Sequence, residues 1–83
     1  MYEMKVSLYF AEDEKEHEDY FNGSSVEEVK SKVSPEYVAR IGNQYSMLPG
    51  EVVISYTISK DGEYIDSEEI FAEYTGREIC MFA

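Results

Sequence analysis

The sequence predicts a small α+β domain in which an antiparallel sheet carries its helices on one face. Two segments with alternating apolar residues each lead into a second strand, which gives two hairpins. Between these hairpins lies a segment with helical periodicity and a capping signal. The expected order is β-β-α-β-β, with an extra helix and a short final strand as additional elements. A chain of 83 residues forms a single domain, residues 1–83.

The first hairpin is predicted from an alternating segment that leads into an acidic run. Five apolar residues occupy every second position: Tyr2, Met4, Val6, Leu8 and Phe10. This period indicates a strand with one buried face. Apolar character returns after the acidic run, at Tyr20 and Phe21. We therefore expect the second strand over about residues 16–21 and the turn near residues 12–14.

One or two helices are predicted between the hairpins. Ser25 and Glu28 have the spacing of a capping box, and three valines follow at helical intervals: Val26, Val29 and Val33. The first helix is therefore expected to run from Ser25 to Val33. Ser34-Pro35 then provides a second cap and first turn. The residues from there to a stop at Gly42 form either a second short helix or a kinked continuation of the first.

The second hairpin is predicted from another alternating segment and a turn signal. Four apolar residues alternate with polar ones: Val52, Ile54, Tyr56 and Ile58. Asp61-Gly62 follows as a two-residue hairpin turn, because both residue types tolerate positive φ. The returning strand would place Ile65 opposite Ile58.

Residues 66–76 admit two interpretations. An N-cap residue, two acidic first-turn residues and a glycine stop favour a helix: Ser67, Glu68, Glu69 and Gly76. Alternatively, the returning strand continues to a turn at Thr75-Gly76. We predict the helix, followed by a short strand over residues 77–82.

The charge of the chain limits its partners. It has 18 acidic and 7 basic residues, and its formal net charge is −11 at pH 7. Nucleic-acid binding requires basic side chains that neutralise phosphates. Here these side chains are scattered: Lys5, Lys15, Lys30, Lys32, Arg40, Lys60 and Arg77. We therefore expect no direct binding to nucleic acid and, for the same reason, none to an anionic membrane surface.

Cysteine usage and hydropathy predict a cytoplasmic protein. Cys80 is the single cysteine, so an intrachain disulfide is impossible, as is typical of a reducing compartment. The first residues alternate in polarity and lack an apolar signal core. No stretch approaches the roughly 20 apolar residues of a membrane span. A chain this short does not enclose a deep pocket for a large cofactor, and we expect no cofactor.

No catalytic or metal-binding motif is present in the sequence, and we expect a non-enzymatic protein. His17 is the only histidine, and the carboxylates around it favour its protonated form, which suits neither a general base nor a metal ligand. It is expected to be an exposed surface residue. Cys80 lies in an apolar stretch and is expected to be a buried or half-buried structural thiol. The acidic run lacks the spacing of a calcium-binding loop.

Two clusters of carboxylates are the candidate partner-binding surface. The first cluster comprises Glu12, Asp13, Glu14, Glu16, Glu18 and Asp19. The second cluster comprises Asp61, Glu63, Asp66, Glu68, Glu69 and Glu73. In an extended segment the even-numbered glutamates of residues 12–18 would point to one side, about 6.6 Å apart. That spacing is close to the separation of phosphates along a nucleic-acid strand. The clusters either dock in a basic protein groove or only solvate the surface.

In size, acidity, tyrosine content and element order, the chain resembles small phage or mobile-element inhibitor proteins, including anti-CRISPR proteins and nucleic-acid mimics. The resemblance implies a protein that occupies a basic surface of a nucleic-acid-handling protein and blocks it. Tyr9, Tyr20 and Tyr64 are candidate anchors, since interface hot spots favour tyrosine. The competing hypothesis is a small structural or assembly domain that binds through an apolar face or a sheet edge.

Overall fold

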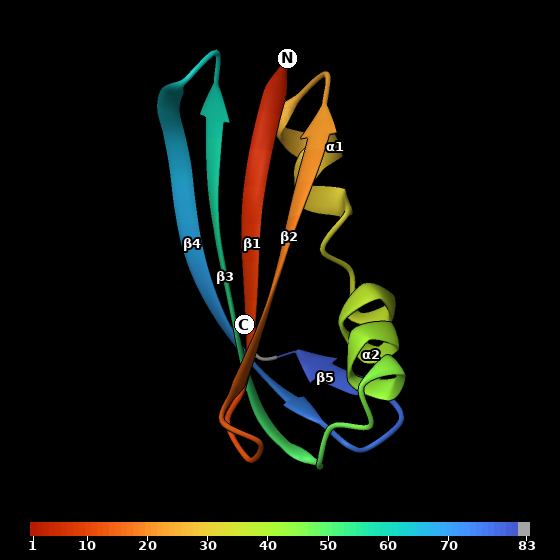
Figure 1. Ribbon diagram of the computed structural model, residues 1–83. Helices are drawn as coiled ribbons and strands as arrows, with labels where there is room; N and C mark the ends of the chain where they lie inside the picture. Colours follow the sequence, from red (N-terminus) through yellow and green to blue (C-terminus); the bar gives the residue numbers. More distant parts are fainter. Residues whose placement is uncertain (82–83) are drawn as a thin grey trace.

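The computed structural model describes residues 1–81. In chain order the elements are β1 (Tyr2–Phe10), β2 (Lys15–Gly23), α1 (Val26–Ser31), α2 (Pro35–Gln44), β3 (Gly50–Lys60), β4 (Glu63–Tyr74) and β5 (Ile79–Met81). The strands form one antiparallel sheet in the order β2-β1-β3-β4-β5 (Figure 1). The α+β class and the antiparallel sheet are confirmed, whereas the predicted order of elements is matched only roughly.

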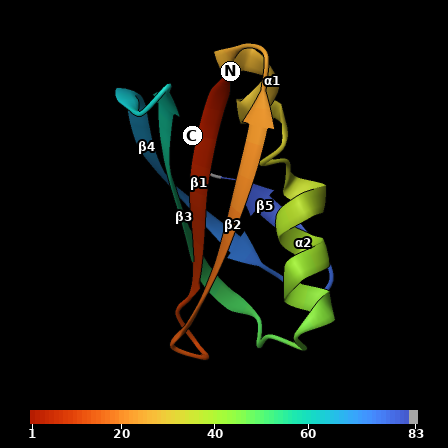
Figure 2. The same cartoon turned by 45° about the horizontal axis from the view of Figure 1, so that its top comes forward.

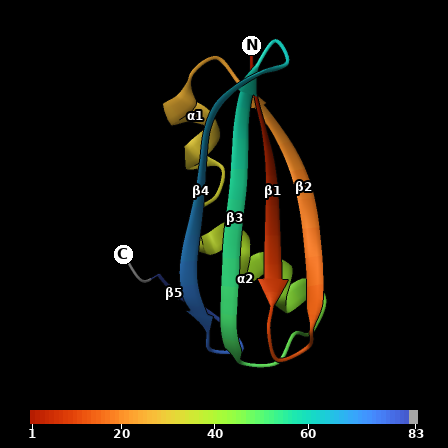
Figure 3. The same cartoon turned by 90° about the vertical axis from the view of Figure 1, so that its left-hand side faces the viewer.

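The core lies between the sheet and the two helices. The alternating residues of β1 and β3 are buried as predicted: Met4, Val6, Leu8, Phe10, Val52, Ile54, Tyr56 and Ile58. Helix α1 contributes Val29, and α2 contributes Tyr37, Val38 and Ile41. Both helices lie behind the same face of the sheet, and the curled β4–β5 end turns toward α2 (Figures 2 and 3). Within residues 1–81, no helix lies on the opposite face of β1–β4 (Figure 3).

Residues 63–74 form a strand, so the predicted helix over residues 66–76 is wrong and the alternative, a continuing strand, is right. The capping signals at Ser67 and Gly76 are local, whereas β4 pairs with β3 from Glu63 to Tyr74, with one interruption at Ile65. Burial of Ala72 and Tyr74 against the core outweighs helix propensity, which is a weak preference.

A β-bulge in β4 decides which of its side chains face the core. Ile58 pairs with Asp66 and Ser59 with Tyr64, so Ile65 is an extra residue of β4. Our prediction that Ile65 lies opposite Ile58 is therefore wrong. A shift of one residue reverses the face of every side chain after it. Pairing without the bulge would turn three residues toward the helices: Glu69, Phe71 and Glu73. The bulge turns the alternate set inward instead: Ile70, Ala72 and Tyr74.

The two helices are separate and each has its own serine cap. Ser25 Oγ accepts a hydrogen bond from Glu28 N at 3.1 Å, and Ser34 Oγ accepts one from Tyr37 N at 3.1 Å. The Glu28 carboxylate accepts the amide of Ser24 at 2.8 Å, one residue before the position that a capping box implies. The first helix ends at Ser31, two residues before the predicted Val33.

Helix α2 continues past Gly42 to Gln44, so the predicted stop at Gly42 is wrong. The glycine instead allows α2 to approach the sheet closely, since a Cβ atom there would lie 2.8 Å from Cζ of Tyr74. The Tyr74 ring is buried edge-on against Phe10, with the ring centroids 6.0 Å apart. Its hydroxyl donates to Asn43 Oδ1 at 2.5 Å. Gly42 and Tyr74 therefore join α2 to β4.

The predicted Asp61-Gly62 turn is confirmed, and it leads to a first testable expectation. Both residues have positive φ, 52° at Asp61 and 83° at Gly62. No heavy atom lies within 4 Å of a Cβ atom built at Gly62, so a side chain there would meet backbone strain alone. We expect Gly62→Val to lower the free energy of unfolding by about 1 kcal/mol or more, because a β-branched residue resists this φ. Denaturant titration measures it, with Asp61→Gly as a control that should cost no stability.

The final strand begins at Ile79, two residues later than predicted, and Phe82 lies outside the described residues. Tyr74 pairs with Ile79 and Glu73 pairs with Cys80. Ile79 therefore shares the inner face with Tyr74, whereas Cys80 points away from the core. Cys80 is exposed, so our expectation of a buried or half-buried thiol is wrong.

Candidate functional site

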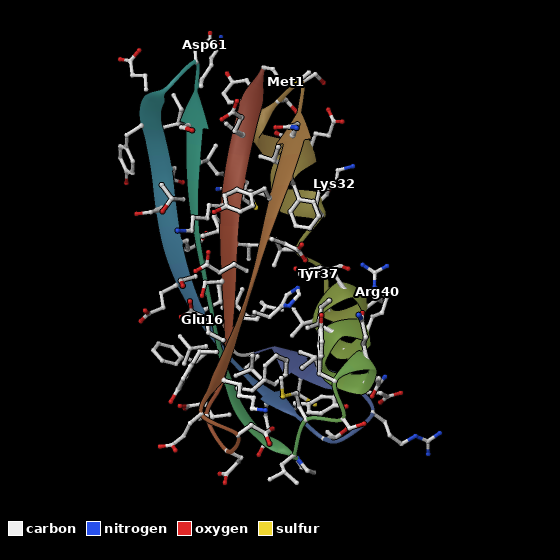
Figure 4. The ribbon with its side chains drawn as sticks, viewed as in Figure 1. Met1, Glu16, Lys32, Tyr37, Arg40 and Asp61 are labelled. Carbon is white, nitrogen blue, oxygen red and sulfur yellow. The ribbon has the colours of Figure 1, made fainter. Side chains whose placement is uncertain are left out.

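The candidate site is the side of the sheet that faces away from the helices, which we call the open face. Strand registers assign it these residues: Glu3, Lys5, Ser7 and Tyr9 on β1; Glu16, Glu18 and Tyr20 on β2; Glu51, Val53, Ser55 and Thr57 on β3; Ser67, Glu69, Phe71 and Glu73 on β4. Figure 4 shows Glu16 on this side of the sheet, whereas Tyr37 and Arg40 lie on the side of α2.

The open face concentrates negative charge. Six of its residues are glutamates, and its single basic residue is Lys5, whose Nζ lies 3.6 Å from Glu18 Oε2. Glu51 and Glu73 stand directly opposite each other on β3 and β4. Like charges in this arrangement destabilise a sheet. The face thus holds carboxylates that the fold alone does not need.

An apolar row crosses this acidic face near the end of the sheet that carries the β1–β2 turn. Tyr9, Val53 and Phe71 are successive cross-strand partners on β1, β3 and β4. Tyr9 is 37% exposed and Phe71 is 48% exposed. Glu16 is the cross-strand partner of Tyr9 on its other side, and Glu69 and Glu73 stand two residues either side of Phe71. Each aromatic ring is therefore bordered by carboxylates on the same face.

Four of the predicted binding residues come together on the open face. Glu16 and Glu18 belong to the first acidic cluster, and Glu69 and Glu73 belong to the second. The expected ladder of four glutamates over residues 12–18 is wrong, because the chain turns at residues 11–14 and Glu14 has a φ of 52°. Only Glu16 and Glu18 occupy alternate positions of a strand.

Several of the remaining predicted residues hold the fold together. The Asp13 carboxylate accepts the amide of Leu48 at 2.8 Å, and Asp66 forms an ion pair with Lys30 at 3.4 Å. Glu68 accepts a hydrogen bond from the Tyr56 hydroxyl. Asp19 lies on the inner face, where it accepts a hydrogen bond from Tyr37. Four more lie at the two ends of the sheet, in the β1–β2 turn or the β3–β4 hairpin: Glu12, Glu14, Asp61 and Glu63. Asp61 Oδ1 lies 3.9 Å from the N-terminal ammonium group.

Sequence reasoning missed part of the open face. Glu3 and Glu51 stand at outward positions of β1 and β3, and the alternation of these strands was sufficient to find them. Tyr9 was predicted as an anchor, and it is exposed. Phe71 was assigned to a helix, and only the bulge at Ile65 brings it beside Val53.

A second polar cluster lies on the inner face, where β2 meets α2. The Tyr37 hydroxyl donates to Asp19 Oδ2 at 2.5 Å, and His17 Nε2 lies 3.0 Å from the same oxygen. His17 is half-buried, so our expectation of an exposed histidine is wrong. The Arg40 guanidinium lies over the Tyr37 ring, 5.6 Å from its centroid. These contacts connect α2 to β2. Figure 4 labels Tyr37 and Arg40 on α2.

The hydrogen bond from Tyr37 lowers the pKa of Asp19, burial opposes this effect, and the hydrogen bond from His17 lowers the pKa further. Burial raises the pKa of Tyr37, and its hydrogen bond to Asp19 raises it again. The cluster therefore contains an ionised aspartate and a neutral tyrosine at neutral pH.

Asp19 should make the stability of the domain depend on pH. Its pKa in the folded chain lies below the ordinary value of 3.8, so its ionised form stabilises the fold above that pH. This contribution is lost as the pH falls through the lowered pKa. We expect Asp19→Asn to cost about 1 kcal/mol at pH 7 and less at pH 3, by denaturant titration. A cost that is equal at both pH values would contradict the ionic role of Asp19.

The open face also has a shallow polar hollow. It is lined by Lys5, Ser7, Glu16, Glu18, Ser55, Tyr56 and Thr57. Among residues 1–81, no three or more histidine, cysteine, aspartate or glutamate side chains are grouped so that they could hold a metal ion. Within the same residues, no helix has the length and apolar character needed to cross a membrane.

No protein-family model, curated protein or solved structure matches the chain.

Proposed function

We propose that this protein is a non-enzymatic binding protein that docks its open face against a basic surface of a nucleic-acid-handling protein and blocks that surface. The resemblance to small phage and mobile-element inhibitors, many of which occupy nucleic-acid channels, implies this mode of action. The observation that supports the proposal most strongly is the grouping of six glutamates from four strands on a sheet face that no helix of the described residues covers.

Charge decides which classes of partner fit the open face. Nucleic acid and anionic membranes have the same sign of charge as the glutamates and are repelled. A second copy of the chain is disfavoured, because stacking two open faces would oppose six carboxylates to six others. A basic protein surface has the complementary charge, which speeds association and suppresses wrong partners.

A nucleic-acid-handling protein is the preferred partner because its basic groove is built for regularly spaced anions. Glu16 and Glu18 are two residues apart on β2, which places their Cα atoms about 6.6 Å apart on the same face. Glu69 and Glu73 extend the same charged surface to β4, three strands away. The rigid sheet holds these anions in place, so that less entropy is lost when a partner binds.

Capture from the lysate of a host cell at low and high salt tests the proposal. The bait is compared with a triple variant of the open face, Glu16→Gln, Glu69→Gln and Glu73→Gln, and with a control triple on the helix side, Glu27→Gln, Glu36→Gln and Glu78→Gln. We expect a nucleic-acid-binding protein to be retained by the wild type and the control at low salt only, and to lose its nucleic acid when bound. Capture that withstands high salt and the open-face substitutions would contradict the proposal.

One observation favours the competing hypothesis of an assembly domain. β5 pairs only with Ala72, Glu73 and Tyr74 of β4, so residues 63–71 of β4 form a sheet edge without a partner strand among the described residues. Such an edge can pair with a strand of another chain. Binding through this edge would depend on backbone hydrogen bonds and would survive high salt, which separates it from binding through the open face.

A further inference from the structure

The apolar row within the acidic open face has a consequence for the kind of basic residue that fits there. Tyr9 and Phe71 present aromatic rings to solvent, and Val53 lies between them. A purely electrostatic surface for solvated cations needs no exposed rings. The row should therefore bind arginine and lysine side chains of a partner with different affinity.

Arginine and lysine differ at such a surface. The planar guanidinium is weakly hydrated, stacks flat on an aromatic ring and donates paired hydrogen bonds to a carboxylate. The ammonium of lysine is a strongly hydrated point charge and gains less from the ring. A ring with a carboxylate beside it therefore favours arginine.

Both rings of the apolar row have this combination, and a third exposed ring of the open face, Tyr20, lies outside the row beside Glu18. On β1, the ring of Tyr9 has Glu16 of β2 as its cross-strand neighbour. On β4, Phe71 has Glu69 and Glu73 at two residues' distance on the same face, about 6.6 Å away along the strand. The two rings lie on strands separated by β3, and thus about 10 Å apart at the usual strand spacing.

The face is also large enough to form a major part of an interface with a polypeptide partner. Four strands at about 4.8 Å spacing and nine residues at about 3.3 Å rise give a projected area of roughly 550 Å². Each partner in a standard interface contributes about 800 Å² of accessible surface. A single small cation would leave most of this face, and most of its glutamates, unoccupied.

We infer that the open face binds an arginine-rich polypeptide surface, with arginine side chains stacked on Tyr9 and Phe71 and paired with Glu16, Glu69 and Glu73. This inference rests on the proposed function and adds the chemical identity of the partner's contact residues. It assigns ring stacking to the apolar row and ion pairing to the glutamates around it.

Two peptides of equal length and charge, nona-arginine and nona-lysine, test the inference by calorimetric titration of the full chain at low salt. Stacking on two exposed rings should make nona-arginine bind about tenfold more tightly. Replacing both rings, Tyr9→Leu with Phe71→Leu, should remove most of this preference. The matched control is Tyr45→Leu, an exposed tyrosine beside α2 that is 51% exposed and should have no effect on the preference.

The outcomes separate this inference from the proposed function. If both peptides bind equally, or if the preference for arginine persists without the two rings, the inference is overturned. The charge-led function stands in that case, provided that the open-face triple variant still weakens both peptides. If neither peptide binds, both the inference and the proposed function fail.

Discussion

Tyr74→Ala is expected to lower the free energy of unfolding by about 3–5 kcal/mol, the usual cost of removing a large aromatic side chain from a core. Tyr74 is 1% exposed, packs edge-on against Phe10 and fills the space that Gly42 leaves on α2. The substitution would also leave Asn43 without its hydrogen bond from the tyrosine hydroxyl. Denaturant titration at neutral pH measures the loss, which is a large fraction of the total stability of a domain of this size.

Phe71→Ala is the matched control for the register of β4. Phe71 is an aromatic residue of the same strand, three positions earlier, and it is 48% exposed on the open face. We expect it to cost about 1 kcal/mol or less, because little apolar surface is returned to water. In the regular register without the bulge, the two residues would exchange faces. A larger loss for Phe71→Ala than for Tyr74→Ala would therefore show that the bulge at Ile65 is misplaced.

The open-face triple variant, Glu16→Gln with Glu69→Gln and Glu73→Gln, is expected to slow association with a basic peptide by about tenfold or more at low salt. These three carboxylates have no partner cation among the contacts of the described residues, whereas Glu18 is engaged by Lys5. The fold should survive, and it should gain stability where Glu73→Gln removes the repulsion from Glu51. Stopped-flow association with nona-lysine and thermal unfolding measure the two effects.

The helix-side triple variant makes this comparison independent of net charge. Glu27, Glu36 and Glu78 are exposed residues outside the sheet, and their neutralisation raises the net charge of −11 by the same three units. We expect association at close to the wild-type rate, because the local field of the open face is unchanged. Equal slowing in both triples would mean that overall charge, and no particular face, governs the encounter.

Strand alternation was sufficient to predict β1, β3 and the hairpin that joins β3 to β4. Their apolar residues can be buried in only one strand register, since a shift of the register by one residue would expose all of them. The turn at Asp61-Gly62 was equally well determined, because few residues tolerate two successive positive φ values. These elements have local patterns that agree with the final fold.

The second half of β4 could not be predicted in the same way. The residues from Ser67 to Gly76 have the signals of a capped helix, and only pairing with β3 makes them a strand. The bulge at Ile65 shifts the register of β4 by one residue, and nothing in the local sequence specifies this bulge. The β4 part of the candidate site depends on this feature, because the bulge turns Glu69, Phe71 and Glu73 onto the open face.

The first acidic cluster shows how charge density alone misleads. Six consecutive or near-consecutive acids looked equivalent in the sequence, yet Asp19 points inward to Tyr37 and Asp13 caps the amide of Leu48. Only Glu16 and Glu18 reach the open face. The position of a carboxylate relative to the sheet, which the sequence does not state, decides whether it is available to a partner.

Nuclear magnetic resonance with carbon-13-labelled aromatic rings tests most directly whether the open face is the binding surface. The probe is nona-arginine, titrated into the full chain at low salt. Binding at the open face predicts that the ring signals of Tyr9 and Phe71 shift with the peptide, whereas those of Tyr37 and Tyr45 on the α2 side do not. Shifts confined to Tyr37 and Tyr45, with Tyr9 and Phe71 unchanged, would contradict the account and place the binding surface on the other side of the sheet.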